Sequence, residues 1–172
     1  MAKKKLNVIG LVFACLVLVG LVLVIVGMCT GIISATAGNE SESISLSHDI
    51  WDVFAKAQEL ADKAPNVDVN IPSRTFTIIA FIVTIIGAVA LLAHAVLAIL
   101  GKDIKLLGLC GGGITVIGAI LILVAGLVLA GQFNDYSKLD IYSAGAGIWL
   151  GFIGGLVAGA AGILFALKIG QK

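Results

Sequence analysis

The sequence predicts an all-α integral membrane protein, a four-helix transmembrane bundle with an amphipathic helix in its first outer loop. Three observations predict it. Of the 172 residues, 60% are hydrophobic and only 12% are charged, about half the charged share of a soluble domain. Four apolar runs are each long enough to cross a bilayer, which takes about 20 residues. These runs do not alternate between polar and apolar residues, which argues against the strands of a membrane β-barrel.

The four predicted spans cover most of the chain, which we treat as one membrane domain, 1–172. They run over residues 6–33, 76–100, 106–130 and 144–167, and none contains Asp, Glu, Lys or Arg. The first run is far longer than the roughly 7–15-residue core of a secretory signal, so we expect it to be retained as a span. Residues 34–75 and 131–143 are the predicted outer loops.

The lysines and arginine near the span ends predict the orientation. The side that holds both termini carries seven lysines and one acid, whereas the other side carries four basic residues and nine acids. Because basic residues favour the cytoplasmic side, we expect both termini in the cytoplasm and a multi-pass protein of the plasma membrane. With a net charge of only +1, the chain is not expected to bind nucleic acid.

The first outer loop has a predicted internal order. Gly38 to Ser45 is small and polar and is interpreted as a tether. From Ser47 to Ala64 apolar residues recur at helical spacing, with Ser47 as N-cap and Pro65 after the end. The apolar face of this helix either covers the outer ends of the spans or docks another protein, and its candidate interaction residues are Trp51, Phe54 and Leu60.

Glycine spacing is the most specific pattern within the spans. Span four carries an unbroken series with a period of four, and spans one and three carry shorter pairs at the same spacing. Such faces let helices approach closely. Packing inside the bundle, self-association and a pore all remain open for these candidate helix-packing residues, which are Gly147, Gly151, Gly155 and Gly159 in span four, Gly27 and Gly31 in span one, and Gly108 and Gly112 in span three.

His94 is the only histidine within a span, and the spans hold no acid to pair with it. We expect it to be structural, bonded to a backbone carbonyl or to Thr115, rather than part of a proton path. Cys15, Cys29 and Cys110 lie in the spans at spacings unlike a metal site. The sequence therefore predicts no catalytic residue, no cofactor and no metal, and a protein that is not an enzyme.

Features of the last three spans resemble a known superfamily. Arg74 lies just before span two, residues 106–128 are rich in small side chains, and residues 142–162 combine Trp149 with glycines. This order of parts resembles the claudin and peripheral-myelin-protein tetraspan superfamily, which implies cytoplasmic termini and a long first outer loop. The G-L-W-x-x-C-x-x-C motif of that loop is missing, and Trp51 falls in a helical pattern where claudin loops form a small sheet. No junction-forming role is therefore carried over.

These observations favour a non-enzymatic tetraspan protein that works by helix packing and outer-loop interaction, as an adhesion protein, a scaffold or an auxiliary subunit. The alternative is a small oligomeric channel or transport component assembled through the glycine-rich face of span four. The expected partners are the lipid bilayer and either further copies of the chain or another membrane protein.

Overall fold

The computed structural model describes residues 8–37, 44–48, 72–100, 102, 104–137 and 142–167. This part of the chain is mostly helical, with the long helices α1 (Val8–Cys29), α3 (Pro72–Ile99), α4 (Lys105–Ser137) and α5 (Ala146–Ala166). All four are long and apolar enough to cross a membrane. The prediction of four membrane-spanning helices is therefore confirmed.

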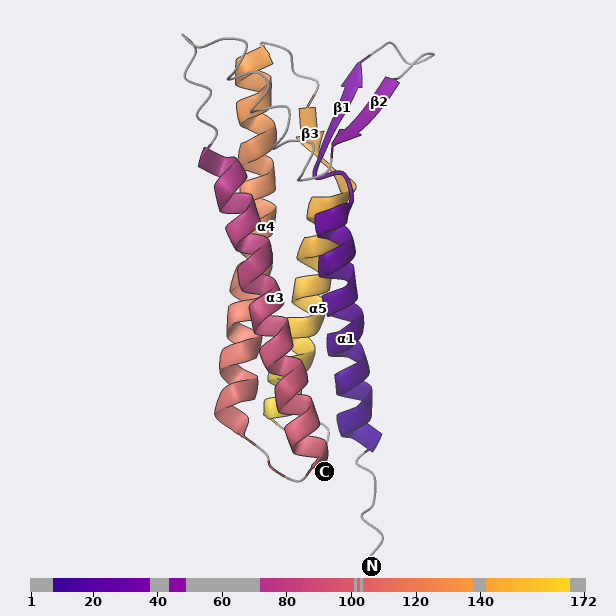
Figure 1. The fold of residues 1–172 in the computed structure, drawn as a ribbon, viewed down its shortest axis with the longest axis vertical. Helices are drawn as coiled ribbons and strands as arrows, with labels where there is room; N and C mark the ends of the chain where they lie inside the picture. The colour runs from indigo at the N-terminus through magenta and orange to yellow at the C-terminus, as the bar shows by residue number, and fades with distance from the viewer. Residues whose placement is uncertain are drawn as a thin grey trace, which may run out of the picture.

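The four helices lie alongside one another in a bundle (Figure 1). Helix α1 packs against α5 and α3, and α4 packs against α3 and α5. Helix α1 begins and α5 ends at the same end of the bundle, and a small sheet lies at the opposite end (Figure 1). We refer to the end with the sheet as the outer end.

The sheet was not predicted, and it corrects the expectation of an all-α protein. Strands β1 (Ile33–Ala37), β2 (Ile44–His48) and β3 (Tyr142–Ala144) pair antiparallel in the order β2-β1-β3. In register, Ile33 lies opposite both His48 of β2 and Ala144 of β3. The sheet therefore joins chain segments that lie on either side of three membrane helices.

The predicted tether and the start of the predicted amphipathic helix are wrong. Ile44 and Ser45, at the tether's end, and Ser47, the predicted N-cap, all lie in β2. The sequence Ile-Ser-Leu-Ser alternates with the period of two that suits a strand, and pairing with β1 outweighs the capping preference of Ser47. Residues 49–71, which hold the rest of that helix, lie outside the described residues.

The first span is shorter than predicted, because α1 ends at Cys29 and not near Ile33. The Thr30 hydroxyl donates to the carbonyl of Val26 at 2.6 Å, which satisfies one of the last helical carbonyls. After Gly31 the chain turns, and Ile32 and Ile33 are fully buried at the outer end of the core. The chain therefore stays packed against the bundle as it passes from helix to strand.

The third span is longer than predicted, because α4 continues through residues 131–137, which were assigned to an outer loop. Its apolar portion of 31 residues measures about 46 Å at 1.5 Å per residue, whereas the hydrocarbon core is about 30 Å thick. The outer turns of α4 therefore extend beyond the membrane. They are held there by contacts with β3, as described below.

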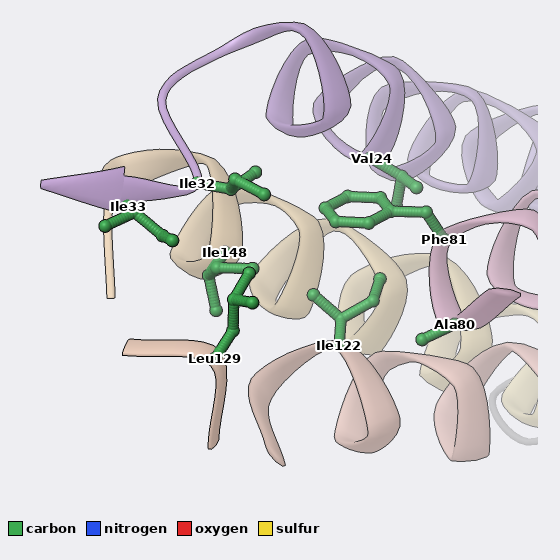
Figure 2. Close-up of a cluster of buried hydrophobic side chains, with 8 residues drawn as sticks. All are labelled: Val24, Ile32, Ile33, Ala80, Phe81, Ile122, Leu129 and Ile148. Carbon is green, nitrogen blue, oxygen red and sulfur yellow. The ribbon is translucent and has the colours of Figure 1, made fainter. Parts of the chain in front are cut away.

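The core consists of two clusters stacked along the bundle. The outer cluster contains Val24, Ile32, Ile33, Ala80, Phe81, Ile122, Leu129 and Ile148 (Figure 2). In it the Phe81 ring of α3 points across the bundle toward Val24 of α1 (Figure 2). The inner cluster contains Val17, Leu91 and Ala161. Because lipid tails are as apolar as these side chains, close packing rather than removal from water stabilises both clusters.

Candidate functional site

The glycine series of α5 faces the inside of the chain's own bundle. Its four members are all buried. A β-carbon added to Gly151 would lie 2.7 Å from the Phe81 ring of α3, and one added to Gly155 would lie 2.7 Å from the Ala119 β-carbon of α4. Real β-carbons do not approach other atoms this closely, so any side chain at the two central positions would push the helices apart.

The two ends of the series make backbone contacts with different helices. A β-carbon on Gly147 would meet the carbonyl oxygen of Gly27 and lie 2.8 Å from that of Thr30, at the end of α1. A β-carbon on Gly159 would lie 3.0 Å from the Gly112 carbonyl oxygen of α4. The series therefore contacts α1, α3 and α4 in turn as α5 passes down the bundle.

Helices α1 and α5 have the most direct backbone contact. A β-carbon on Gly20 would lie 2.7 Å from the β-carbon of Ala158, and one on Gly154 would lie 2.6 Å from the Gly20 carbonyl oxygen. Further out, a β-carbon on Gly27 would lie 2.7 Å from the Gly151 nitrogen. Because the backbones touch at two levels, van der Waals contacts accumulate along the whole interface.

The remaining predicted packing glycines also contact the chain's own helices. Gly108 of α4 faces His94, and a β-carbon on Gly112 would lie 2.5 Å from Ile163 of α5. Gly31 lies beyond the end of α1, where its carbonyl accepts a hydrogen bond of 2.9 Å from the Gly147 N–H. Among the uses that the sequence left open, the structure shows packing inside one bundle.

His94 is the most unusual polar group in the described part of the membrane region. Its side chain is 1% exposed, and neither Nδ1 nor Nε2 has a hydrogen-bond partner. The imidazole packs edge-on to the Phe165 ring, with 5.4 Å between ring centroids, and its Nε2 lies 2.7 Å from where a Gly108 β-carbon would be. The imidazole is therefore held by packing alone.

The predicted hydrogen bond from His94 to Thr115 is wrong. The Thr115 hydroxyl donates instead to the Gly111 carbonyl of its own helix at 2.7 Å, as the Thr84 hydroxyl does to the Ala80 carbonyl. Such a bond to the residue four positions earlier is always available within a helix. Moreover, Thr115 packs against Gly87, two turns of α3 away from His94.

The outer end carries polar contacts that the sequence analysis did not find. The Asn134 side chain of α4 donates from Nδ2 to the Tyr142 carbonyl at 3.0 Å and accepts at Oδ1 from the Tyr142 N–H at 2.8 Å. The rings of Phe133 and Tyr142 pack with centroids 5.5 Å apart. The available signal was Asn134 itself, a polar residue next to an aromatic one just beyond a span.

Strands β1 and β3 continue directly into the helices of the α1 and α5 pair. Three residues separate α1 from β1, and one residue, Gly145, separates β3 from α5. The Gly145 N–H donates to the Ile32 carbonyl at 2.8 Å. On the sheet itself the Ser34 and Ser143 hydroxyls lie 3.0 Å apart and are hydrogen-bonded. The sheet therefore has no long linker to either helix.

The other predicted site residues have different outcomes. Trp51, Phe54 and Leu60, the candidates for outer-loop interaction, lie outside the described residues. Cys15, Cys29 and Cys110 are free thiols on the outside of the bundle. Within the described ranges, no three of the His, Cys, Asp and Glu side chains lie together as metal ligands would.

No protein family, curated protein or solved structure matches the chain. The comparisons therefore assign it to no family. The function has to be argued from the contacts of the bundle and of the outer sheet.

Proposed function

We propose that this chain is a non-enzymatic, multi-pass protein of the plasma membrane that acts as an adhesion protein, a scaffold or an auxiliary subunit. Its termini lie in the cytoplasm and its sheet faces outward, in keeping with the excess of lysine on the side of the termini. The observation that carries the proposal is the direct attachment of the outer sheet to the membrane helices.

Three helices hold the sheet in place. Helices α1 and α5 enter β1 and β3 through connections of three residues and one residue, and α4 holds β3 through the two hydrogen bonds between Asn134 and Tyr142. A sheet fixed in this way keeps its orientation relative to the membrane. A fixed orientation lets another protein be bound without an additional ordering cost.

The polar groups inside the bundle support a role without chemistry. Among the described residues the buried polar side chains are Thr77, Thr84, His94 and Thr115. Thr84 and Thr115 use their hydroxyls on their own helices. His94 contacts aromatic and small residues. General acid–base catalysis needs positioned proton donors and acceptors that face one another, and these side chains are dispersed.

The alternative, a channel assembled through the glycine face of α5, is less well supported. That face contacts α1, α3 and α4 of the same chain. A second copy would reach it only if the bundle opened. The same contacts leave no glycine of the α5 series to line a pore.

The proposal is tested with two matched sets of variants in cells that show a phenotype when the protein is removed. Asn134→Ala loosens the sheet, whereas His94→Leu and Thr115→Val remove buried polar groups. We expect Asn134→Ala to reduce rescue of the phenotype severalfold at equal membrane abundance, and both membrane variants to rescue fully. Full rescue by Asn134→Ala with loss of rescue by His94→Leu would contradict the proposal.

A flux measurement addresses the alternative directly. Vesicles that contain the purified protein should leak ions and small neutral solutes no faster than protein-free vesicles. A conductance that disappears in Gly155→Leu would support the channel and overturn the proposed role.

A further inference from the structure

The outward face of α1 repeats its residue types every seven positions. Three consecutive heptads carry a large aliphatic residue, then Val, then a small residue three positions later: Leu11, Val12, Cys15; Leu18, Val19, Val22; Ile25, Val26, Cys29. We call these nine residues the α1 seam. All nine are exposed on the bundle surface.

The inward face of α1 uses other positions of the same heptads. Gly20 and Gly27 contact α5, and Val17 and Val24 are buried in the two core clusters. Even so, α1 has the smallest buried share of the four spans. Its outward face is therefore wide, and a second helix could lie along it without disturbing the contacts with α3 and α5.

A seven-residue repeat is the spacing at which two helices pack side by side along their full length. In this seam Val recurs at positions 12, 19 and 26, and β-branched residues at one of the two core positions favour two-stranded parallel pairs. Small side chains between them, at Cys15 and Cys29, bring the backbones closer.

We infer that two copies of this chain associate in the membrane through the α1 seam. All copies inserted with one topology have parallel α1 helices, so a two-fold axis along the membrane normal brings each seam against its own copy. Equal residues then meet across the axis. Cys29 of one copy lies opposite Cys29 of the other, and Val22 lies opposite Val22.

The area of the seam sets the strength of the association. Nine half-exposed aliphatic or thiol side chains offer on the order of 450 Å² per copy, at roughly 50 Å² each. This is about half of the ~800 Å² per partner in a standard stable complex. The dimer is therefore reversible, and a narrow seam of this kind fits one helix and not a globular partner.

Disulfide trapping with the native cysteines tests the inference. One form keeps only Cys29 (Cys15→Ala, Cys110→Ala), and its matched control keeps only Cys110 (Cys15→Ala, Cys29→Ala), which is exposed on α4 outside the seam. After oxidation of vesicles with copper phenanthroline, we expect the Cys29 form to give at least tenfold more covalent dimer. No dimer from Cys29, or equal yields from both forms, would show lipid contact or random collision and would overturn the inference.

Energy transfer between labelled copies in vesicles provides a test that does not depend on thiol chemistry. Val22→Trp should reduce transfer severalfold, whereas Val96→Trp on the exposed face of α3 should leave it unchanged; the two native side chains are 48% and 54% exposed. Unchanged transfer in Val22→Trp would contradict the dimer. The proposed function depends on the outer sheet, so a monomeric result here would leave it standing.

Discussion

One side chain of α4, Asn134, satisfies both backbone polar groups of Tyr142 in β3: it donates to the carbonyl at 3.0 Å and accepts from the N–H at 2.8 Å. The amide thus acts like a neighbouring strand at the free edge of β3. It shields an edge that would otherwise pair with other chains. It also links the fourth face of the outer assembly, α4, to the α1 and α5 pair.

Asn134→Ala should destabilise the outer end without affecting the inner bundle. The change leaves a partly buried N–H and C=O of Tyr142 without these partners, which costs about 1–3 kcal/mol. We expect a lower thermal midpoint in detergent and faster hydrogen exchange at the Tyr142 amide. Asn134→Asp, which keeps the acceptor and loses the donor, should fall between the variant and the original protein. Unchanged exchange at Tyr142 in Asn134→Ala would refute the link.

Leucine at Gly151 or Gly155 should disrupt the fold of the single chain. Each new side chain would overlap Phe81 or Ala119, and overpacking of this kind costs about 1–3 kcal/mol or more. Ala160→Leu is the control, because Ala160 lies on the exposed face of α5. Thermal stability and monomer compactness by size-exclusion chromatography should fall for the two glycine variants alone. A stable monomer that loses only its oligomers would instead assign this face to self-association.

His94→Leu should be as stable as the original protein, or more so by about 1 kcal/mol, because a buried side chain without hydrogen bonds gains little from being polar. His94→Gln should be no more stable than the original, since it leaves polar atoms buried in the same place. Thermal unfolding in detergent compares the three proteins. A marked loss of stability in His94→Leu would mean that the imidazole holds a partner, such as a bound water.

The topology should place Ser143 outside the cell and Gln171 inside. Cysteines at these two positions, in a background without the native three, report accessibility to an impermeant maleimide in intact cells. Ser143 lies on the exposed side of the sheet, so we expect Ser143→Cys to label fully and Gln171→Cys to label only after permeabilisation. The opposite pattern would reverse the orientation.

The sequence allowed the membrane part of this fold to be predicted because hydrocarbon imposes strict conditions on it. Backbone groups in lipid must be satisfied within the segment, so a long uncharged run has to be helical. The four spans follow from this alone. The glycine spacing also located α5's packing face, but which helix each glycine contacts depends on how the four helices are arranged, and no local pattern encodes that arrangement.

The outer end could not be predicted to the same degree. Strand β3 has three residues, and it pairs with Ile33–Ala35 only because α1 and α5 bring these segments together. Ser47 suited both a helix cap and a strand, and pairing between β1 and β2 decided the outcome. The extension of α4 to Ser137 is likewise stabilised by Tyr142, a residue five positions further along the chain.

The most direct test of the account is a disulfide between Ser34→Cys and Ser143→Cys in a background without the native cysteines. Their hydroxyls lie 3.0 Å apart, and the two residues are paired across β1 and β3, so their α-carbons are at about 4.5–5.5 Å, within the range for a disulfide. We predict nearly complete intramolecular bond formation, a raised thermal midpoint and full rescue in cells. Reduced thiols, or bonds only between chains, would contradict an outer sheet fixed to the membrane helices.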